Sequence, residues 1–456
     1  MATLFIRSVN GPKRHYKAWT LEAILFVDWI AVNLIGYLML CGLTGFAASE
    51  GTTVIRNVTV IDPGSNLVGA HWSVLLSAGK IQAVGVIAEP LNATVIDGSG
   101  RFLIPGLWDM HVHLWNSKNL PALYLAFGVT GVRDMGSSFE RTTALRRSIE
   151  DGVVAGPHFL TSGPGVDGRK GDDARLPILI ASTPEQARQA VDDVHDMGAD
   201  FVKVFTQIEL EPYLALMERA RQWRMPVSGH LPAKVRLEDA IELKQASIEH
   251  FFGLERLTET RLRKAFNAAA ASGVRFTPTL SMHKRTLLQG VDEMVADPRL
   301  QLIPADLKKD WGDPQKDWAK ASADFKEKAP QTYAHYREMT RWLKASGVTI
   351  LAGSDTGDPF TIPGASLQDE LVLLVEAGLT PLEALRGATS EAARFNKLEG
   401  MFGSIAPGLT GDVVLLEGDP LADIGNVRKV AGVCWRGRCY GKDGILRFQQ
   451  SPSPSP

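Results

Sequence analysis

The chain has 456 residues, of which 45% are hydrophobic and 22% are charged, and its formal net charge is −2. This composition is that of an ordinary globular protein, and the length allows two or three domains, or one barrel with additions. The chain has no basic excess that would neutralise phosphates. The composition therefore argues against a nucleic-acid partner and favours small or neutral substrates.

Residues 1–48 differ from the rest of the chain and predict an export segment. Basic residues precede an apolar stretch over residues 21–46, and small residues follow it. This order is typical of a secretory signal peptide cleaved after Ala47 or Ala48, although the uncut stretch is also long enough to span a bilayer. Both interpretations predict an exported protein, periplasmic or extracellular, and the second tethers it to the membrane through residues 21–46. A buried helix of the fold is a third interpretation.

Short β-branched runs dominate both ends of the remaining chain, over residues 49–104 and 403–448. Turn signals such as Asp62-Pro-Gly64 separate them. We expect one small β-sandwich domain built from both ends, followed by a disordered tail at 449–456. Cys434 and Cys439 face each other across a predicted hairpin, where a disulfide and two free thiols are both consistent with the sequence.

Strand-like and helix-like runs alternate between residues 105 and 402, which is typical of parallel βα units. The predicted strands cover residues 107–114, 131–135, 158–162, 201–205, 227–231, 247–250, 275–280 and 349–354. Helical runs separate them, for example residues 183–197, which end at Gly198. Eight such units predict an α/β fold with a (β/α)8 TIM barrel, whose reactive residues lie where the strands end. The charged segment at about 285–340 is expected to be a helical insertion on that side.

His111 and His113 lie two positions apart in the first predicted strand, so both imidazoles leave it on one face. Two neutral imidazoles supply half of a tetrahedral zinc-type ligand set. Further polar residues lie within or at the ends of later predicted strands, namely Lys203, His230, His250 and Asp355. Each residue alone is more often structural. Six on one rim of a barrel predict a metal centre.

These residues and their surroundings resemble the amidohydrolase superfamily, and within it the imidazolonepropionase-like branch with its metal-dependent dipeptidases and prolidase-like enzymes. The similarity extends over about residues 52–445 and rests on Pro105-Gly-Leu-Trp-Asp-Met-His-Val-His113, Gly128-Val-Thr-Gly-Val-Arg-Asp-Met-Gly136, Val202-Lys-Val204, His230, Glu249-His250, Gly353-Ser-Asp355 and Gly408-Leu-Thr-Gly-Asp412. The resemblance implies two divalent metal ions, expected to be Zn²⁺. One would be held by His111, His113, Lys203 and Asp355, and the other by Lys203, His230 and His250.

Lys203 would be carboxylated in such a site and would bridge the two metals. A protonated amine has no lone pair for a cation, and burial beside cations disfavours the charged form. The resemblance further implies that a metal-bridging hydroxide attacks the substrate, with Asp355 as the catalytic proton carrier. The predicted function is a metal-dependent amidohydrolase that cleaves a carbon–nitrogen bond in a small amide, dipeptide or N-acyl amino acid.

Two alternatives to this function stay open. The same binuclear site could hydrolyse lactones or organophosphates, or the chain could be a non-catalytic binding protein on a hydrolase barrel. Arg133 is a candidate for binding a substrate carboxylate or for a structural ion pair, and His283 is a candidate substrate contact. Pro232 and Gln368 depart from the pattern of the family, so the resemblance does not specify the acyl group or the amine.

Overall fold

The computed structural model describes residues 51–114, 120–170, 176–288, 294–303, 305–311 and 320–450. The predicted export segment lies outside these residues, as does the tail from residue 451. Within the described ranges, no helix is long and apolar enough to cross a membrane. The chain divides into two units, one comprising residues 1–48 and 90–92 and the other residues 49–89 and 93–456. The described helices and strands lie in the second unit.

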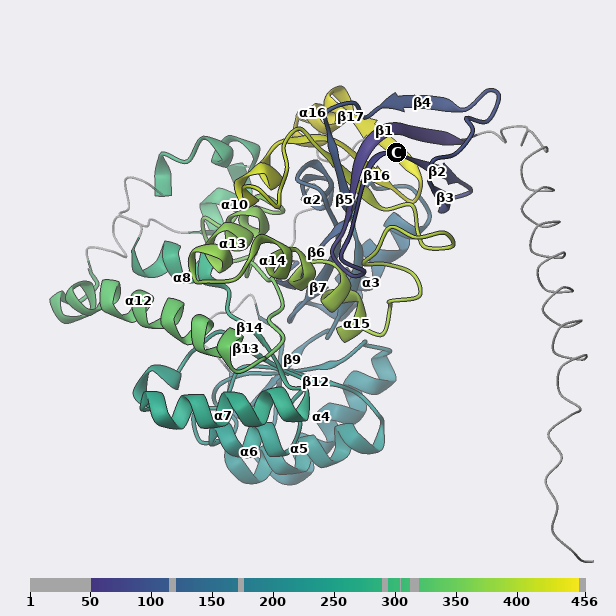
Figure 1. The fold of residues 1–456 in the computed structure, drawn as a ribbon. Helices are drawn as coiled ribbons and strands as arrows, with labels where there is room; N and C mark the ends of the chain where they lie inside the picture. The colour runs from purple at the N-terminus through teal and green to yellow at the C-terminus, as the bar shows by residue number, and fades with distance from the viewer. Residues whose placement is uncertain are drawn as a thin grey trace, which may run out of the picture. The chain divides into compact units, whose positions relative to one another are not determined.

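Strands from both ends of this unit form one eight-stranded sheet, in the order β17-β16-β15-β5-β1-β2-β3 with β4 beside β1. The strands are β1 (Thr53–Asp62), β2 (Leu67–Ser77), β3 (Lys80–Gly85), β4 (Thr94–Asp97), β5 (Phe102–Pro105), β15 (Val413–Leu416), β16 (Val430–Trp435) and β17 (Arg438–Gly441). Figure 1 shows strands from the two ends of the chain, purple and yellow, in the same part of the fold, and β5 pairs with both β1 and β15. Its apolar core includes Ile55, Leu76 and Val413. Hydrogen bonds thus join all eight strands into one sheet rather than two separate ones.

The cysteine hairpin has the predicted register. Cys434 pairs with Cys439 across the antiparallel strands β16 and β17, and the two form a disulfide. The turn residues Arg436 and Gly437 have positive φ angles of 50° and 74°, which a two-residue hairpin turn of type I′ requires. A helix, α16 (Lys442–Gln450), follows β17, where the sequence predicts the end of the β domain and the start of a disordered tail.

Parallel strands form the middle of the chain. A three-stranded sheet has the order β6-β7-β8, and a six-stranded sheet has the order β10-β9-β11-β12-β13-β14. Their bounds are β6 (Leu107–Val112), β7 (Val129–Asp134), β8 (His158–Thr161), β9 (Gly165–Asp167), β10 (Ile178–Ile180), β11 (Val202–Val204), β12 (Val227–Gly229), β13 (Ser247–Glu249) and β14 (Arg275–Thr277). The two short strands β9 and β10 lie between the third and fourth predicted strands, where no strand was predicted.

The eighth predicted strand, at 349–354, is not a regular strand in the structure, but the segment is hydrogen-bonded to its neighbours on both sides. Ile350 makes a parallel bridge to Phe276 of β14. On the other side of the segment, the backbone N–H of Met110 donates to Ala352 at 2.9 Å, and that of Asp355 donates to His111 at 2.8 Å. This segment therefore connects β14 to β6 and brings the first and last parts of the parallel region together.

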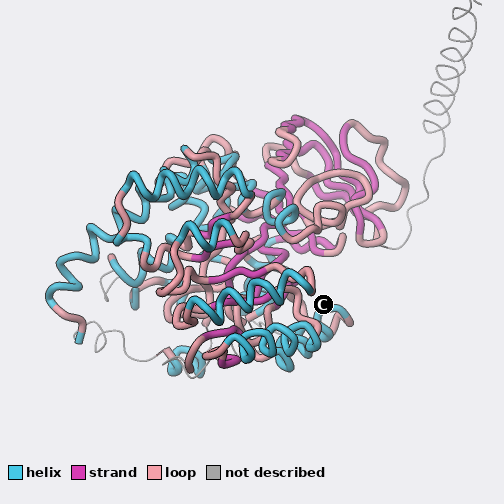
Figure 2. Tube along the Cα trace, turned by 90° about the horizontal axis from the view of Figure 1, so that it is seen from below, coloured by secondary structure: helices cyan, strands magenta, loops and turns pink. Residues whose placement is uncertain are grey.

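Helices follow most of the parallel strands, and in Figure 2 cyan helices flank the magenta strands of this region. The helices are α2 (Pro121–Ala126), α3 (Phe139–Glu150), α4 (Pro184–Met197), α5 (Leu210–Gln222), α6 (Leu237–Glu242), α7 (Glu259–Ser272), α8 (Leu280–Leu287), α10 (Ala305–Asp310), α12 (Ala323–Ala345), α13 (Ala365–Glu376), α14 (Pro381–Gly387) and α15 (Ser390–Phe395). Helix α4 begins after Thr183, whose side chain accepts from Gln186 N–H, and it ends at Gly198, as predicted. Short 3-10 turns cover Leu254–Arg256 (η1), Pro298–Leu302 (η2) and Ile424–Arg428 (η3).

Candidate metal centre

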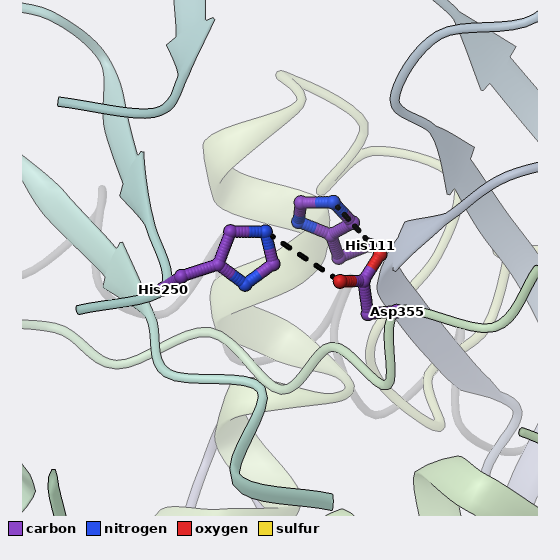
Figure 3. Close-up of side chains that lie close together, drawn as sticks. All are labelled: His111, His250 and Asp355. Carbon is purple, nitrogen blue, oxygen red and sulfur yellow. Dashed lines mark ion pairs between the residues drawn. The ribbon is translucent and has the colours of Figure 1, made fainter. Parts of the chain in front are cut away.

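Three imidazoles surround the carboxylate of Asp355. The Nε2 atoms of His111 and His113 both lie 3.3 Å from Asp355 Oδ1, and His250 Nε2 lies 3.6 Å from Oδ2. Figure 3 shows His111, His250 and Asp355 converging from separate segments, and their ligand-type atoms lie within 4.8 Å of one another. The structure thus brings together four of the predicted ligands, from the first, sixth and eighth predicted strands.

A contact through Nδ1 fixes the orientation of each predicted histidine ligand. In all four histidines of the predicted ligand set, Nδ1 contacts a protein oxygen, which leaves Nε2 for the centre. The contacts are His111 to Glu249 Oε2 at 2.9 Å, His113 to the Gly136 carbonyl at 3.2 Å, His230 to Thr206 Oγ1 at 2.6 Å and His250 to Thr279 Oγ1 at 2.6 Å. Metal-binding histidines are typically held in this way through their other nitrogen.

Lys203 and His230 complete the set predicted from the sequence. Lys203 lies in β11 with no exposed surface, and its Nζ is 4.8 Å from the ring centre of Phe205. Burial lowers the pKa of Lys203 to about 8, although the charges of Glu249 and Asp355 oppose this shift. The ring of His230 lies 5.1 Å from that of His250, centre to centre. A larger neutral fraction of the Lys203 amine makes it a better ligand or nucleophile.

The backbone around the centre is locally strained. His250 and Asp355 have positive φ angles of 63° and 57°, in the left-handed region that side chains other than glycine rarely adopt. Asp355 is held there by its N–H bond to the carbonyl of His111, and His250 by its N–H bond to Thr277. Such strain persists where surrounding structure enforces it, and it is frequent at functional sites.

Several buried polar atoms at the centre lack hydrogen bonds. His111 Nε2, Lys203 Nζ and Asp355 Oδ1 have no hydrogen-bond partner within the described part of the chain. Unsatisfied buried groups are costly, so native proteins rarely leave several together. Imidazole nitrogens with a carboxylate and an amine-derived group are suitable ligands for zinc-class ions. The residues present therefore fit a bound divalent cation.

Arg133 lies in β7, is 1% exposed, and is linked to His111 of the centre through Glu249. Its guanidinium donates to Glu249 Oε1 at 2.7 Å, to the Met110 carbonyl at 2.7 Å and to Ser247 Oγ at 3.2 Å, so all three nitrogens have protein acceptors. Burial alone would raise the pKa of Glu249, but Arg133 and His111 hold it well below its usual range. Of the two roles predicted for Arg133, this geometry favours the structural ion pair over contact with a substrate carboxylate.

Two acids for which the sequence predicts no role, Glu249 and Asp109, shape the centre. Glu249 precedes His250 and links Arg133 to His111. Asp109 accepts from the Ser354 backbone at 2.9 Å, and burial raises its pKa to about 7. Their positions in the sequence could have identified both acids, since Asp109 shares the strand face of His111 and Glu249 adjoins a predicted ligand.

The remaining candidates lie in different surroundings. His283, on α8, is 2% exposed, and its ring lies 5.9 Å from that of His250 and 4.5 Å from that of Tyr336. Burial lowers the pKa of His283 to about 3, so it is neutral. Gln368, on α13, donates instead to backbone carbonyls at 2.9 and 3.0 Å, which makes it a packing residue of that helix.

Comparison with known proteins agrees with this geometry. The amidohydrolase family model matches residues 102–439. Ochratoxinase of Aspergillus niger is 25% identical over 442 residues, covering 83% of this chain and 84% of the relative. Among solved structures, a Xaa-Pro dipeptidase superposes with a TM-score of 0.67 at 22% identity, covering 86% of this chain and 100% of the other. A bottromycin amidohydrolase gives a TM-score of 0.71 at 23% identity, covering 88% and 89%.

Proposed function

Because the chain belongs to the amidohydrolase family and is a metal-dependent hydrolase of carbon–nitrogen bonds, we propose that it cleaves the amide bond of a small N-acyl amino acid or dipeptide. The observation that carries this proposal is the group of three imidazoles around Asp355. In each of them Nδ1 contacts a protein oxygen, so that Nε2 is directed at the centre. Relatives named for peptide and amide cleavage, the dipeptidase and the bottromycin amidohydrolase, support the choice of an amide over an ester.

The same proposal extends to the architecture. Residues 105–402 form a closed (β/α)8 barrel with a helical insertion at about 285–340, and residues 49–104 and 403–448 form a β domain built on the single eight-stranded sheet. Backbone hydrogen bonds that join Asp355 to His111, and Asp200 to Thr161 at 2.9 Å, support closure of the parallel strands into a ring. A barrel would place every predicted ligand on one rim.

In this proposal the centre would bind two divalent cations, expected to be Zn²⁺. His111, His113, Lys203 and Asp355 would hold one, and Lys203, His230 and His250 would hold the other. When bound, such cations polarise the substrate carbonyl and lower the pKa of water. Lys203 would bridge as a carbamate, formed when its neutral amine adds to carbon dioxide and releases a proton; the buried Nζ without a hydrogen bond supports this.

The residues of the chain then move the proton of hydrolysis. Asp355 accepts a proton from the attacking water through its carboxylate and delivers it to the departing amine, so that a C–O bond forms as the C–N bond breaks. Two of the imidazoles lie near Oδ1 of this carboxylate and the third lies near Oδ2. Glu249 fixes the ring of His111 and keeps its Nε2 directed at Asp355.

The direct test is hydrolysis by the purified full chain loaded with Zn²⁺. N-acyl amino acids and dipeptides are offered, the released amine is quantified, and the metal content is counted by elemental analysis. We expect amine release that stops after chelation and returns when the metal is restored. Cleavage of lactones or phosphotriesters with no amide cleavage would reject the proposal in favour of the alternative on the same site.

Export is part of the proposal. The Cys434–Cys439 disulfide supports it, since such bonds persist mainly in oxidising compartments. Fractionation of cells expressing the full chain, with sequencing of the mature N-terminus, tests this. Release of a protein beginning near residue 48 supports a cleaved signal, membrane retention supports an anchor at residues 21–46, and a cytoplasmic protein contradicts both.

A further inference from the structure

One aromatic side chain beside the centre is left open to solvent. Phe252 follows His250 by two positions, and its ring lies 4.9 Å from that of His250, 5.6 Å from that of His230 and 5.3 Å from that of His283, centre to centre. His250 and Asp355 are 2% and 4% exposed, whereas Phe252 is 41% exposed. Phe252 is therefore an exposed apolar ring in contact with two of the proposed ligands, His230 and His250.

A cavity of about 480 Å³ adjoins this ring. It lies between the loops that follow β12 and β13, and its walls include Phe252, Leu231, Val235 and Leu257. Thr206, the partner of His230 Nδ1, also lines it. This volume is typical of sites for small molecules, and the wall is mostly apolar. Phe252 is therefore a surface that the cavity and the candidate metal centre share.

Guanidinium groups line the same cavity. Arg261 is committed to Glu238 through two hydrogen bonds of 2.7 and 2.8 Å. Arg236 lies 3.7 Å from that same carboxylate, and Arg256 lies 3.6 Å from Glu255 with 85% of its side chain exposed. Both distances exceed those of good hydrogen bonds, so Arg236 and Arg256 keep donors for an anion.

We propose that this cavity is the subsite for the amino-acid half of the substrate. The apolar side chain of that amino acid packs on Phe252, and its free carboxylate pairs with Arg236 and Arg256. The inference rests on the proposed amide hydrolysis and narrows it to N-acyl amino acids with a bulky apolar side chain, cleaved so that this amino acid leaves as the free amine. Arg133, which is buried and paired with Glu249, takes no part in carboxylate binding.

Binding of a small probe tests the subsite without catalysis. The probe is phenylacetate, which carries a ring and a carboxylate, titrated into the Zn²⁺-loaded full chain by calorimetry. We expect Phe252→Ala to weaken binding about tenfold, because the apolar contact is lost. Phe252→Tyr retains the ring and should bind as the parent does. Arg236→Gln with Arg256→Gln should weaken binding about threefold, and less at high salt, since exposed charges are screened.

Matched controls separate local from general effects. Phe325, on α12, is also 41% exposed, and Arg188, on α4, has a 45% exposed side chain. Phe325→Ala and Arg188→Gln should leave phenylacetate binding unchanged. Equal binding in all variants, or weakening in the controls as well, overturns the subsite. Thermal unfolding of each variant confirms that it is folded before binding is measured.

Kinetics then distinguish the subsite from the proposed reaction. N-acetyl-L-phenylalanine, N-acetylglycine and N-acetyl-L-phenylalaninamide are compared. In the parent, the first should have the lowest KM, and Phe252→Ala should raise that KM about tenfold with kcat little changed. If no amide is cleaved but phenylacetate binding depends on Phe252, the proposed reaction is wrong and the subsite stands. If Phe252→Ala leaves the preference among the three unchanged, the subsite is wrong and the reaction stands.

Discussion

Two buried clusters of polar side chains lie against each other in this protein, the Arg133 group and the Asp355 group. They differ in whether their polar atoms have hydrogen-bond partners. Around Arg133, all three guanidinium nitrogens donate to protein acceptors, and both oxygens of Glu249 accept hydrogen bonds or face His111. Around Asp355, the atoms His111 Nε2, Lys203 Nζ and Asp355 Oδ1 have no hydrogen-bond partner in the described ranges. Both groups are almost completely buried, so burial alone does not separate them.

The difference indicates that the Arg133 group has all the hydrogen bonds it needs within the protein, whereas the Asp355 group needs a further partner. A buried charge with all its hydrogen bonds stabilises a particular packing, whereas buried donors and acceptors without partners are costly unless something else binds them. Glu249 belongs to both groups, because it joins Arg133 to His111. We infer that the Arg133 group is a support for the Asp355 group, and variants of each should fail in different ways.

The largest expected effect is on catalysis at Asp355. Asp355→Asn keeps the size of the side chain and removes the proton acceptor, so kcat for amide hydrolysis should fall about 10³-fold or more. Amine release at saturating substrate measures kcat, with the metal content counted in parallel. Asp196→Asn, a surface change in α4, is the matched control and should retain parent activity. Parent-like kcat in Asp355→Asn with full metal content would falsify its role as the proton carrier.

Lys203→Met separates ligand binding from folding. The bound metal should fall from two ions toward one per chain, and kcat should fall about 100-fold, as for lost metal contacts. The metal-free protein should be no less stable than the metal-free parent, and more stable by about 1 kcal/mol, since an unsatisfied buried amine is replaced by an apolar chain of similar size. Urea unfolding of the chelated proteins measures this. Marked destabilisation with unchanged metal content would instead show that Lys203 is a structural cation.

Arg133→Met should have the opposite effect on stability. It leaves the Glu249 carboxylate buried without its main cation, and the free energy of unfolding should drop by about 3 kcal/mol. Arg133→Met with Glu249→Gln should recover part of this loss, because the uncompensated charge is gone. Arg188→Met on the surface of α4 should change stability little. If the single variant is as stable as the parent and instead loses affinity for substrate carboxylates, Arg133 belongs to the site and not to its support.

The closeness of the proposed ligands could be predicted from the sequence because their positions depend on local rules. Alternation in a strand puts His111 and His113 on one face, and parallel strands end on one side of a sheet. These two rules suffice to place His250 and Asp355 near them. The hairpin at Cys434 and Cys439 was predictable for the same reason, since its register follows from a two-residue turn.

The partners of Arg133 were not predictable in this way, although a structural ion pair was one of its two predicted roles. Arg133 and Glu249 lie 116 positions apart, and their contact depends on the inward direction of two strands that are not neighbours in sequence. The sequence shows a polar residue at each place but not whether its hydrogen bonds are satisfied. The segment at 349–354 shows the same limit, because its pairing with β14 and β6 depends on tertiary packing more than on its own residues.

The smallest effect is expected for Asp297→Asn, which should change the free energy of unfolding and leave activity unchanged. The carboxylate of Asp297 accepts from Arg299 at 2.8 Å and from Arg285 at 3.2 Å, and these bonds outweigh burial and lower the pKa of Asp297 to about 2. An acid with a lowered pKa stabilises the fold above its unfolded pKa of about 3.9, and this contribution is lost as the pH falls from about 4 through 2. Asp297→Asn should therefore lower the free energy of unfolding by about 1–2 kcal/mol at pH 6, and the difference from the parent should vanish near pH 2. Urea unfolding across this pH range measures the difference, with Asp193→Asn on α4 as the surface control. Asp297 is hydrogen-bonded to arginines, as Glu249 is to Arg133, and it lies outside the centre, so kcat at neutral pH should be unchanged. A lower kcat would show that complete hydrogen bonding does not distinguish supporting residues from residues of the site.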